Sequence, residues 1–265
     1  MNSITKLKYL TALGVVAALS QSAAGQSFSV EWGSLDSSPP ITYGAQGIPG
    51  AWNTFDAMPN FERLPLFGLD GNPIAADIMN IGFDLIESSD NPLTTGPDAA
   101  LMDDCFTSNN DPIDGCIFMR FLEPGEYKVI MYAMAPDDGS LLSRLRIDQN
   151  TDGPVHVGGT WTGSHEDGIS YMTQMATVGV DGRLDLHSGL QGANIRSVLN
   201  GMQVIAVADL CAADLNGDGN LDFLDISEFL SAYTAGLPIA DLNNDGNHDF
   251  LDISAFLTSY NTGCP

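Results

Sequence analysis

The feature that most constrains this chain is a tandem repeat close to its C-terminus. Residues 213–236 read ADLNGDGNLDFLDISEFLSAYTAG, and residues 240–263 read ADLNNDGNHDFLDISAFLTSYNTG, so the two copies follow one another with a period of 27 residues. Two copies that agree this closely predict one supersecondary unit built twice and packed on itself.

Each copy begins with a twelve-residue loop in which oxygen-bearing side chains occupy positions 1, 3, 5, 9 and 12. Position 6 is glycine, which allows a sharp turn, and the asparagine at position 7 offers a backbone carbonyl. Calcium takes about six to eight oxygen ligands, and this spacing wraps them around one ion. The predicted ligands of two Ca²⁺ ions are Asp214, Asn216, Asp218, Asn220, Asp222, Asp225, Asp241, Asn243, Asp245, Asn247, Asp249 and Asp252.

The charge of this segment also favours a bound cation. Residues 208–265 contain ten acidic residues and no Lys or Arg. Carboxylates a few ångströms apart repel one another by roughly 1 kcal/mol or more per close pair, even when partly solvated. We therefore expect metal binding to be coupled to folding. Position 12 is Asp in both copies, where an EF-hand loop usually carries a bidentate Glu, so each loop has to close more tightly around its ion.

A short helix is expected after each loop, because apolar residues recur there at helical spacing. Leu224 and Leu251 fall on the outer side of these helices, among small hydroxyl residues, which suits a protein-binding surface. His248 replaces Leu221 at loop position 8 and is not expected to be a ligand. The residues predicted to pack the two helices together are Ile226, Phe229, Leu230, Tyr233, Ile253, Phe256, Leu257 and Tyr260.

The pattern D-L-N-x-D-G-N-x-D-F-L-D-I-S-x-F-L, present twice with a helix only after each loop, resembles a type I dockerin, the module that attaches secreted proteins to cohesins. The resemblance covers residues 211–265. It implies a small all-α module, a cohesin-like partner and docking in two orientations. It also assigns the partner contacts to loop positions 10 and 11, which are Phe223, Leu224, Phe250 and Leu251.

The first 25 residues are typical of a secretory signal peptide. Lys6 and Lys8 precede an apolar run, and the small residues 23–25 form a cleavage site. The run is too short to span a bilayer. We therefore expect a secreted, extracellular protein that can also be held at a cell surface by a partner, with no membrane insertion.

The overall charge excludes some partners. With 34 acidic and 9 basic residues the formal net charge is -25, which repels nucleic acid. Cations, neutral polymers such as polysaccharides, and other proteins stay open as partners. Four cysteines in an exported chain predict two disulfides, and proximity in sequence favours Cys105 with Cys116 and Cys211 with Cys264 among the three possible pairings.

Residues 26–207 are predicted to form a mainly β domain, an antiparallel β-sandwich of the jelly-roll kind. Short segments with a period of two are separated by clusters of Gly, Pro, Asn and Asp. The segment 125–135 is apolar on both faces, as expected of a central strand. Only Leu145, Ile147, Leu184 and Leu186 of their strands are expected to face inward. The phrases FLEPGEYKVIMYA and NGMQVIAV are similar to galactose-binding-like domains of secreted bacterial proteins, which implies sugar binding at loops on one edge.

No catalytic motif stands out in this domain. Trp161, flanked by glycines, is predicted to be exposed as a sugar platform, whereas core packing is favoured for Trp32 and Trp52. Residues 164–167, with the sequence SHED, are interpreted as a polar loop tip. The acidic residues Asp103, Asp104, Asp111 and Asp114 are interpreted as a solvated loop tip, with a third cation site as the alternative.

Three functions remain open on this evidence. The favoured hypothesis is a non-catalytic, carbohydrate-binding β-sandwich that a calcium-folded dockerin module docks onto a cohesin-like partner in polysaccharide utilisation. The second is a dockerin-tethered polysaccharide-degrading enzyme, either a glycoside hydrolase or a lyase; whether a bond is broken stays open at this point. The third is a structural component of a surface.

Overall fold

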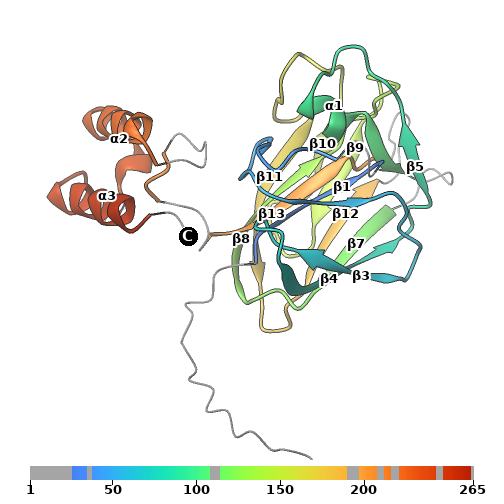
Figure 1. The fold of residues 1–265 in the computed structure, drawn as a ribbon, viewed down its shortest axis with the longest axis horizontal. Coiled ribbons are helices and arrows are strands. Elements are labelled where there is room, and N and C mark those ends of the chain that lie inside the picture. Colours follow the sequence, from blue (N-terminus) through green and yellow to red (C-terminus); the bar gives the residue numbers. More distant parts are fainter. Residues whose placement is uncertain are drawn as a thin grey trace, which may run out of the picture.

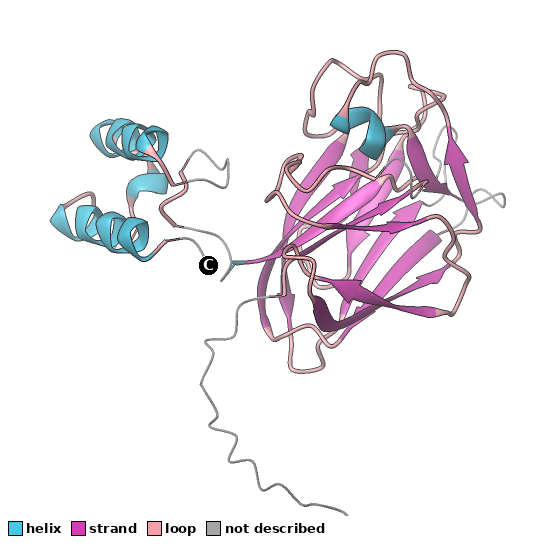
Figure 2. Ribbon diagram, viewed as in Figure 1, coloured by secondary structure: helices cyan, strands magenta, loops and turns pink. Residues whose placement is uncertain are grey.

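The computed structural model describes residues 26–34, 38–107, 114–189, 197–207, 212–215, 221–242 and 247–263. The N-terminal domain is mainly β, and the C-terminal residues form helices (Figures 1 and 2). The N-terminal elements are β1 (Phe28–Trp32), β2 (Trp52–Phe55), β3 (Arg63–Phe67), β4 (Pro73–Ile81), β5 (Leu85–Ser88), α1 (Pro97–Met102), β6 (Asp104–Thr107), β7 (Asp114–Arg120), β8 (Gly125–Tyr132), β9 (Ser143–Ile147), β10 (Val155–Val157), β11 (Tyr171–Val178), β12 (Leu184–Gly189) and β13 (Gly201–Ala206).

Two large sheets face each other in this domain (Figure 1). One has the strand order β11-β8-β13-β1-β2, the other has the order β10-β9-β12-β7-β4-β3, and β5 pairs with β6 in a separate ribbon. The strand pairs are antiparallel except β1 with β2, which run parallel with Ser29 opposite Trp52. The expectation of a purely antiparallel sheet is therefore wrong at this edge, where the long connection between β1 and β2 leaves room for a parallel pairing.

The main core lies between the two sheets. Phe28, Val30 and Trp32 of β1 are fully buried in it, and Trp32 stacks on Phe106 with ring centroids 5.7 Å apart. The inward positions predicted from strands β9 and β12 are confirmed as buried: Leu145, Ile147, Leu184 and Leu186.

A second, smaller core covers the outer face of the five-stranded sheet. Ile130 and Tyr132 of β8 pack there against Leu101 of α1 and against Trp161. Strand β8 is thus buried on both faces, which confirms the prediction made from its two apolar faces. This outer layer is formed by the segment between β1 and β2, by α1 and by the loop after β10.

The outer layer also buries a carboxyl group. Glu31 of β1 is 1% exposed, and burial is the main reason that its pKa rises to about 7, with the charge of Asp104 adding to the effect. Hydrogen bonds from Thr54 and Ser38 act in the opposite direction. Since the native state holds its proton more tightly than the unfolded chain does, ionisation of Glu31 destabilises the fold.

The C-terminal residues form α2 (Phe223–Ala235), the 3₁₀ turn η3 (Pro238–Ala240) and α3 (Phe250–Thr262). Phe229 of α2 and Phe256 of α3 stack nearly parallel, with centroids 4.3 Å apart. They form a small core with Ala213, Ala232 and Ala240. The described part of the chain holds no helix long and apolar enough to cross a membrane.

The predicted bond between Cys105 and Cys116 is not formed in the structure. Cys105 is a buried free thiol packed against Ala135 and Val198. The Sγ atom of Cys116 lies 3.6 Å from Nε2 of His187 on the neighbouring strand β12. The two thiols thus sit in different surroundings, despite their closeness in sequence. Residues 211 and 264, the other predicted pair, lie outside the described residues.

Replacement of Glu31 by Gln tests whether the pKa of the buried Glu31 carboxyl is raised in the folded protein. Relative to Glu31→Gln, the wild type should lose unfolding free energy as pH rises from 4.5 to about 7, because over this window the native Glu31 holds a proton that the unfolded chain has lost. Above pH 7 the variant should be the more stable protein, by up to about 3 kcal/mol. Urea denaturation of residues 26–265 at several pH values measures the difference, with Glu62→Gln, at an exposed site, as control. Parallel pH profiles of wild type and Glu31→Gln would contradict the assignment.

Candidate functional site

The two acidic repeats are the strongest candidate site, and their helix starts are built alike. Asp222 caps α2: its carboxylate accepts a hydrogen bond from the Leu224 amide at 2.7 Å, while the Asp225 carboxylate accepts one from the Asp222 amide at 2.9 Å. Asp249 and Asp252 repeat this reciprocal arrangement at the start of α3. Loop positions 9 and 12 therefore form a capping box that fixes both carboxylates.

The described side chains fit calcium in chemistry and in burial. Asp225 and Asp252 are fully buried carboxylates, in a segment that contains no Lys or Arg. Burying a carboxylate costs several kcal/mol unless it is compensated. A hard cation such as Ca²⁺, which binds oxygen ligands, would supply this compensation. Besides these two, the predicted ligands Asp214, Asp222, Asp241, Asn247 and Asp249 lie in the described residues.

The remaining predicted ligands lie outside the described residues: Asn216, Asp218, Asn220, Asn243 and Asp245. Within the part of the chain that the structure describes, no group of three or more His, Cys, Asp or Glu side chains is placed to hold a metal. The two calcium ions thus stay a prediction. If bound, each would neutralise the carboxylates of its loop and hold the loop against the start of the following helix.

Each of the two helices exposes apolar side chains at its start. Phe223 and Leu224 at the start of α2 are 75% and 57% exposed, and Phe250 and Leu251 at the start of α3 are 74% and 56% exposed. The predicted outward orientation of the leucines is confirmed. The four side chains therefore offer two equivalent apolar patches, one in each copy.

Leu230 and Leu257 were predicted to lie between the helices, and this is wrong. They are 52% and 50% exposed. Each lies seven residues after a phenylalanine of the outward face, Phe223 or Phe250, and two helical turns bring the side chain back to that same face. The i to i+7 spacing was the signal that could have placed these leucines on the outside.

His248 contacts Leu237 and Tyr233, which are not among the predicted calcium ligands. Its Nε2 donates a hydrogen bond to the Leu237 carbonyl at 2.8 Å, and its ring meets Tyr233 edge-on at a centroid distance of 6.3 Å. Leu221, at the equivalent position of the first copy, packs against the small core. The two copies are thus closed by different contacts at loop position 8.

Trp161 is buried, contrary to the prediction that it is an exposed sugar platform. It is 5% exposed and meets the ring of His165 edge-on, with centroids 5.1 Å apart. The interpretation of residues 164–167 as a polar loop tip is also wrong for His165, whose Nε2 lies 2.8 Å from the Tyr43 hydroxyl. Burial lowers the pKa of His165, and the charge of Asp98 opposes this shift. Gly158 instead allows a close approach of two backbone segments, since a Cβ atom there would lie 2.4 Å from the Leu141 carbonyl oxygen.

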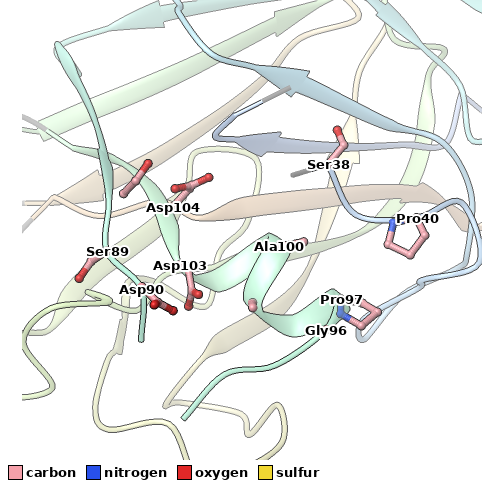
Figure 3. A pocket seen from close by; sticks show the side chains of 11 residues that line it. Ser38, Pro40, Ser89, Asp90, Gly96, Pro97, Ala100, Asp103 and Asp104 are labelled. Carbon is pink, nitrogen blue, oxygen red and sulfur yellow. The ribbon is translucent and has the colours of Figure 1, made fainter. Parts of the chain in front are cut away.

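Two residues of the predicted acidic group, which lie directly after α1 and at the start of β6, line a hollow (Figure 3). Asp103 and Asp104 lie on one side of it together with Asp90, whereas Ser38 and Pro40 lie on the other. Burial raises the pKa of Asp103. Asp104 is 8% exposed, so the interpretation as a solvated loop tip is wrong for this residue. Residue 111 and the side chain of residue 114 lie outside the described part.

Comparisons with known proteins do not assign a family. No protein-family model matches the chain, and no curated protein matches it. Among solved structures, a Bacillus subtilis protein, YxiM, aligns with a TM-score of 0.36 at 12% identity over 68% of this chain and 40% of its own. The ANX2 ectodomain from Arabidopsis thaliana aligns with a TM-score of 0.40 at 12% identity over 68% of this chain and 49% of its own. A Bacteroides uniformis beta-glucuronidase aligns with a TM-score of 0.37 at 9% identity over 68% of this chain and 18% of its own. This chain therefore spans less than half the length of each, and such distant likenesses carry no functional inference.

The paired repeats predict the response of calcium binding to single substitutions. Titration of residues 26–265 by calorimetry should show two Ca²⁺ ions per chain, and Asp225→Asn or Asp252→Asn should each abolish or weaken one of them by at least about 10-fold, since each removes a buried anionic ligand. Glu228→Gln, an exposed change within α2, is the matched control and should leave both sites unchanged. Unchanged stoichiometry and affinity in both Asn variants would exclude these carboxylates as ligands.

Proposed function

We propose that this chain is an exported protein whose C-terminal residues form a dockerin module folded around two calcium ions. The module docks the N-terminal domain, a jelly-roll β-sandwich, onto a cohesin-like partner, and that domain binds polysaccharide. The observation that carries the proposal is the pair of exposed Phe-Leu patches at equivalent positions of the two repeats.

The position of these patches supports a role in binding. Phe223 and Phe250 each directly follow a capping aspartate, so the acidic loop and the apolar patch are held by the same turn of chain. Large exposed aromatic side chains usually mark interaction sites when they occur as a group. Leu230 and Leu257 extend each patch by two turns along its helix. Calcium would thus control the partner-binding surface through the fold of the loop.

A dockerin-tethered polysaccharide-degrading enzyme is the alternative function. The two functions differ in whether a bound glycan is cleaved. Incubation of residues 26–265 with a panel of polysaccharides, followed by assays for new reducing ends and for unsaturated products, separates them, because a hydrolase gives the first alone and a lyase gives both. Binding without either product is expected of the proposed function.

The two patches give a sharp prediction for partner capture. Phe223→Ser with Leu224→Ser should raise the apparent Kd for a cohesin-like partner only about twofold, because it removes one of two equivalent binding orientations. The same change at Phe250 and Leu251 should have the same small effect. All four changes together should weaken binding by at least about 100-fold, since both apolar anchors are lost.

Affinity capture from the secreted fraction of the source organism, with and without a calcium chelator, followed by calorimetry with the captured partner, measures this. Leu93→Ser, at an exposed leucine of the N-terminal domain, is the control. Full capture by the fourfold variant would show that these patches do not bind the partner. Capture that persists in chelator would show that docking does not need calcium.

A further inference from the structure

Two hollows adjoin on one side of the β domain and share a residue. The larger, about 630 Å³, lies between α1, the end of β5 and the segment after β1 (Figure 3). The smaller, about 440 Å³, lies along β2 and β3, the edge strands of the two sheets. Ser38 lines both of them. Together they form an extended site whose two parts meet at Ser38.

The smaller hollow has an aromatic and hydroxyl lining. Phe67 contributes an exposed ring and Thr54 contributes a hydroxyl group, and Trp52, Asn53 and Phe55 line the hollow as residues of β2. Phe67 is 43% exposed, so a ligand can reach its ring. This combination of flat apolar faces with hydrogen-bonding groups suits the apolar face and the hydroxyl rim of a sugar ring.

These groups are held in place by contacts within the domain. The Asn53 side chain donates to the Phe67 carbonyl at 2.8 Å and accepts from the Phe67 amide at 2.8 Å, so it ties β3 to β2 at this point. Trp52 Nε1 donates to the Tyr43 carbonyl at 3.1 Å, and the two rings stack. The aromatic surface is thus pre-organised, which lowers the entropy cost of binding.

The larger hollow is lined by acceptors and hydroxyls. Asp90, Asp103 and Asp104 supply carboxylates, and Ser38, Ser88 and Ser89 supply hydroxyl groups above the apolar surface of α1. Asp103 accepts a hydrogen bond from the Thr94 hydroxyl, and Asp104 accepts one from the Ser34 amide at 3.2 Å. No Lys, Arg or His is among the described residues that line either hollow. An anionic ligand would be repelled here, whereas an amine would gain charge-assisted hydrogen bonds.

We propose that the two adjoining hollows form one binding site for an amino-sugar polysaccharide, with one ring stacked at Phe67 and a free amine of another sugar in the same glycan held by Asp90 and Asp103. The inference rests on the proposed polysaccharide-binding function of this domain and names its ligand class. It replaces Trp161, which is buried, as the candidate sugar-binding position.

Calorimetry with residues 26–265 and a β-1,4-linked glucosamine hexamer tests the proposal. The hexamer should bind at least about tenfold more tightly than its fully N-acetylated counterpart, which lacks the amines, and more weakly as salt is raised. Polygalacturonate should not bind, because its carboxylates meet those of the site. Equal affinity for the acetylated hexamer, or no binding of the glucosamine hexamer, would overturn the proposal. Tighter binding of a lysine hexapeptide than of the glycan would do so too.

Matched variants locate the site. Asp90→Asn with Asp103→Asn should raise the Kd for the glucosamine hexamer about tenfold, and Phe67→Ala should raise it about fivefold. Asp138→Asn and Phe61→Ala alter exposed residues that line neither hollow and should leave the Kd unchanged. Equal Kd values for all four variants would place the glycan elsewhere and contradict the site.

Two controls keep the outcome interpretable. The single variant Asp90→Asn changes an exposed residue, so it replaces the double variant in the binding test if the double variant unfolds at a lower temperature. It should still weaken glycan binding about threefold. Calcium-dependent partner capture is measured on the same preparations. Loss of glycan binding with intact capture refutes this glycan site and leaves the docking function standing, whereas loss of capture with intact glycan binding refutes docking alone.

Discussion

Repulsion between carboxylates governs the C-terminal part of this protein. Each repeat places four acidic side chains in twelve residues, and the whole segment supplies no Lys or Arg to offset them. The structure adds that one carboxylate of each set, Asp225 or Asp252, is fully buried at the start of a helix. A buried anion of this kind is tolerated when hydrogen bonds and a cation compensate its lost hydration. The start of each helix and the apolar patch beside it therefore adjoin the same group of charges.

In the N-terminal domain, one sheet is buried on both of its faces. Its five-stranded sheet packs on the six-stranded sheet and is covered on the outer face by α1 and by the segment after β1. This covering layer is irregular, so it leaves hollows at its margins, and Ser38 lies where two of them meet. The same layer buries Glu31 and raises its pKa to about 7. The hollows and the burial of Glu31 thus arise from one structural feature.

The sequence predicted the parts of this molecule that repeat or alternate. The apolar spacing within each repeat predicted both helices but not which leucines they bury, whereas the alternation around Leu145 and Leu184 correctly predicted which side chains face the core. It could not predict that β1 and β2 pair in parallel, since register across a long connection depends on tertiary packing. It also misplaced Trp161, because flanking glycines permit an exposed ring and a buried one equally. Cys105 and Cys116 show that closeness in sequence does not establish pairing.

The most direct test of this account is the amide NMR spectrum of residues 26–265, with the C-terminal resonances assigned, recorded with calcium and then with excess chelator. The account predicts dispersed C-terminal resonances in calcium that collapse to the narrow range of an unfolded chain in chelator, while the resonances of the β domain do not move. C-terminal resonances that stay dispersed and unshifted in chelator would contradict the claim that bound cations hold this segment folded.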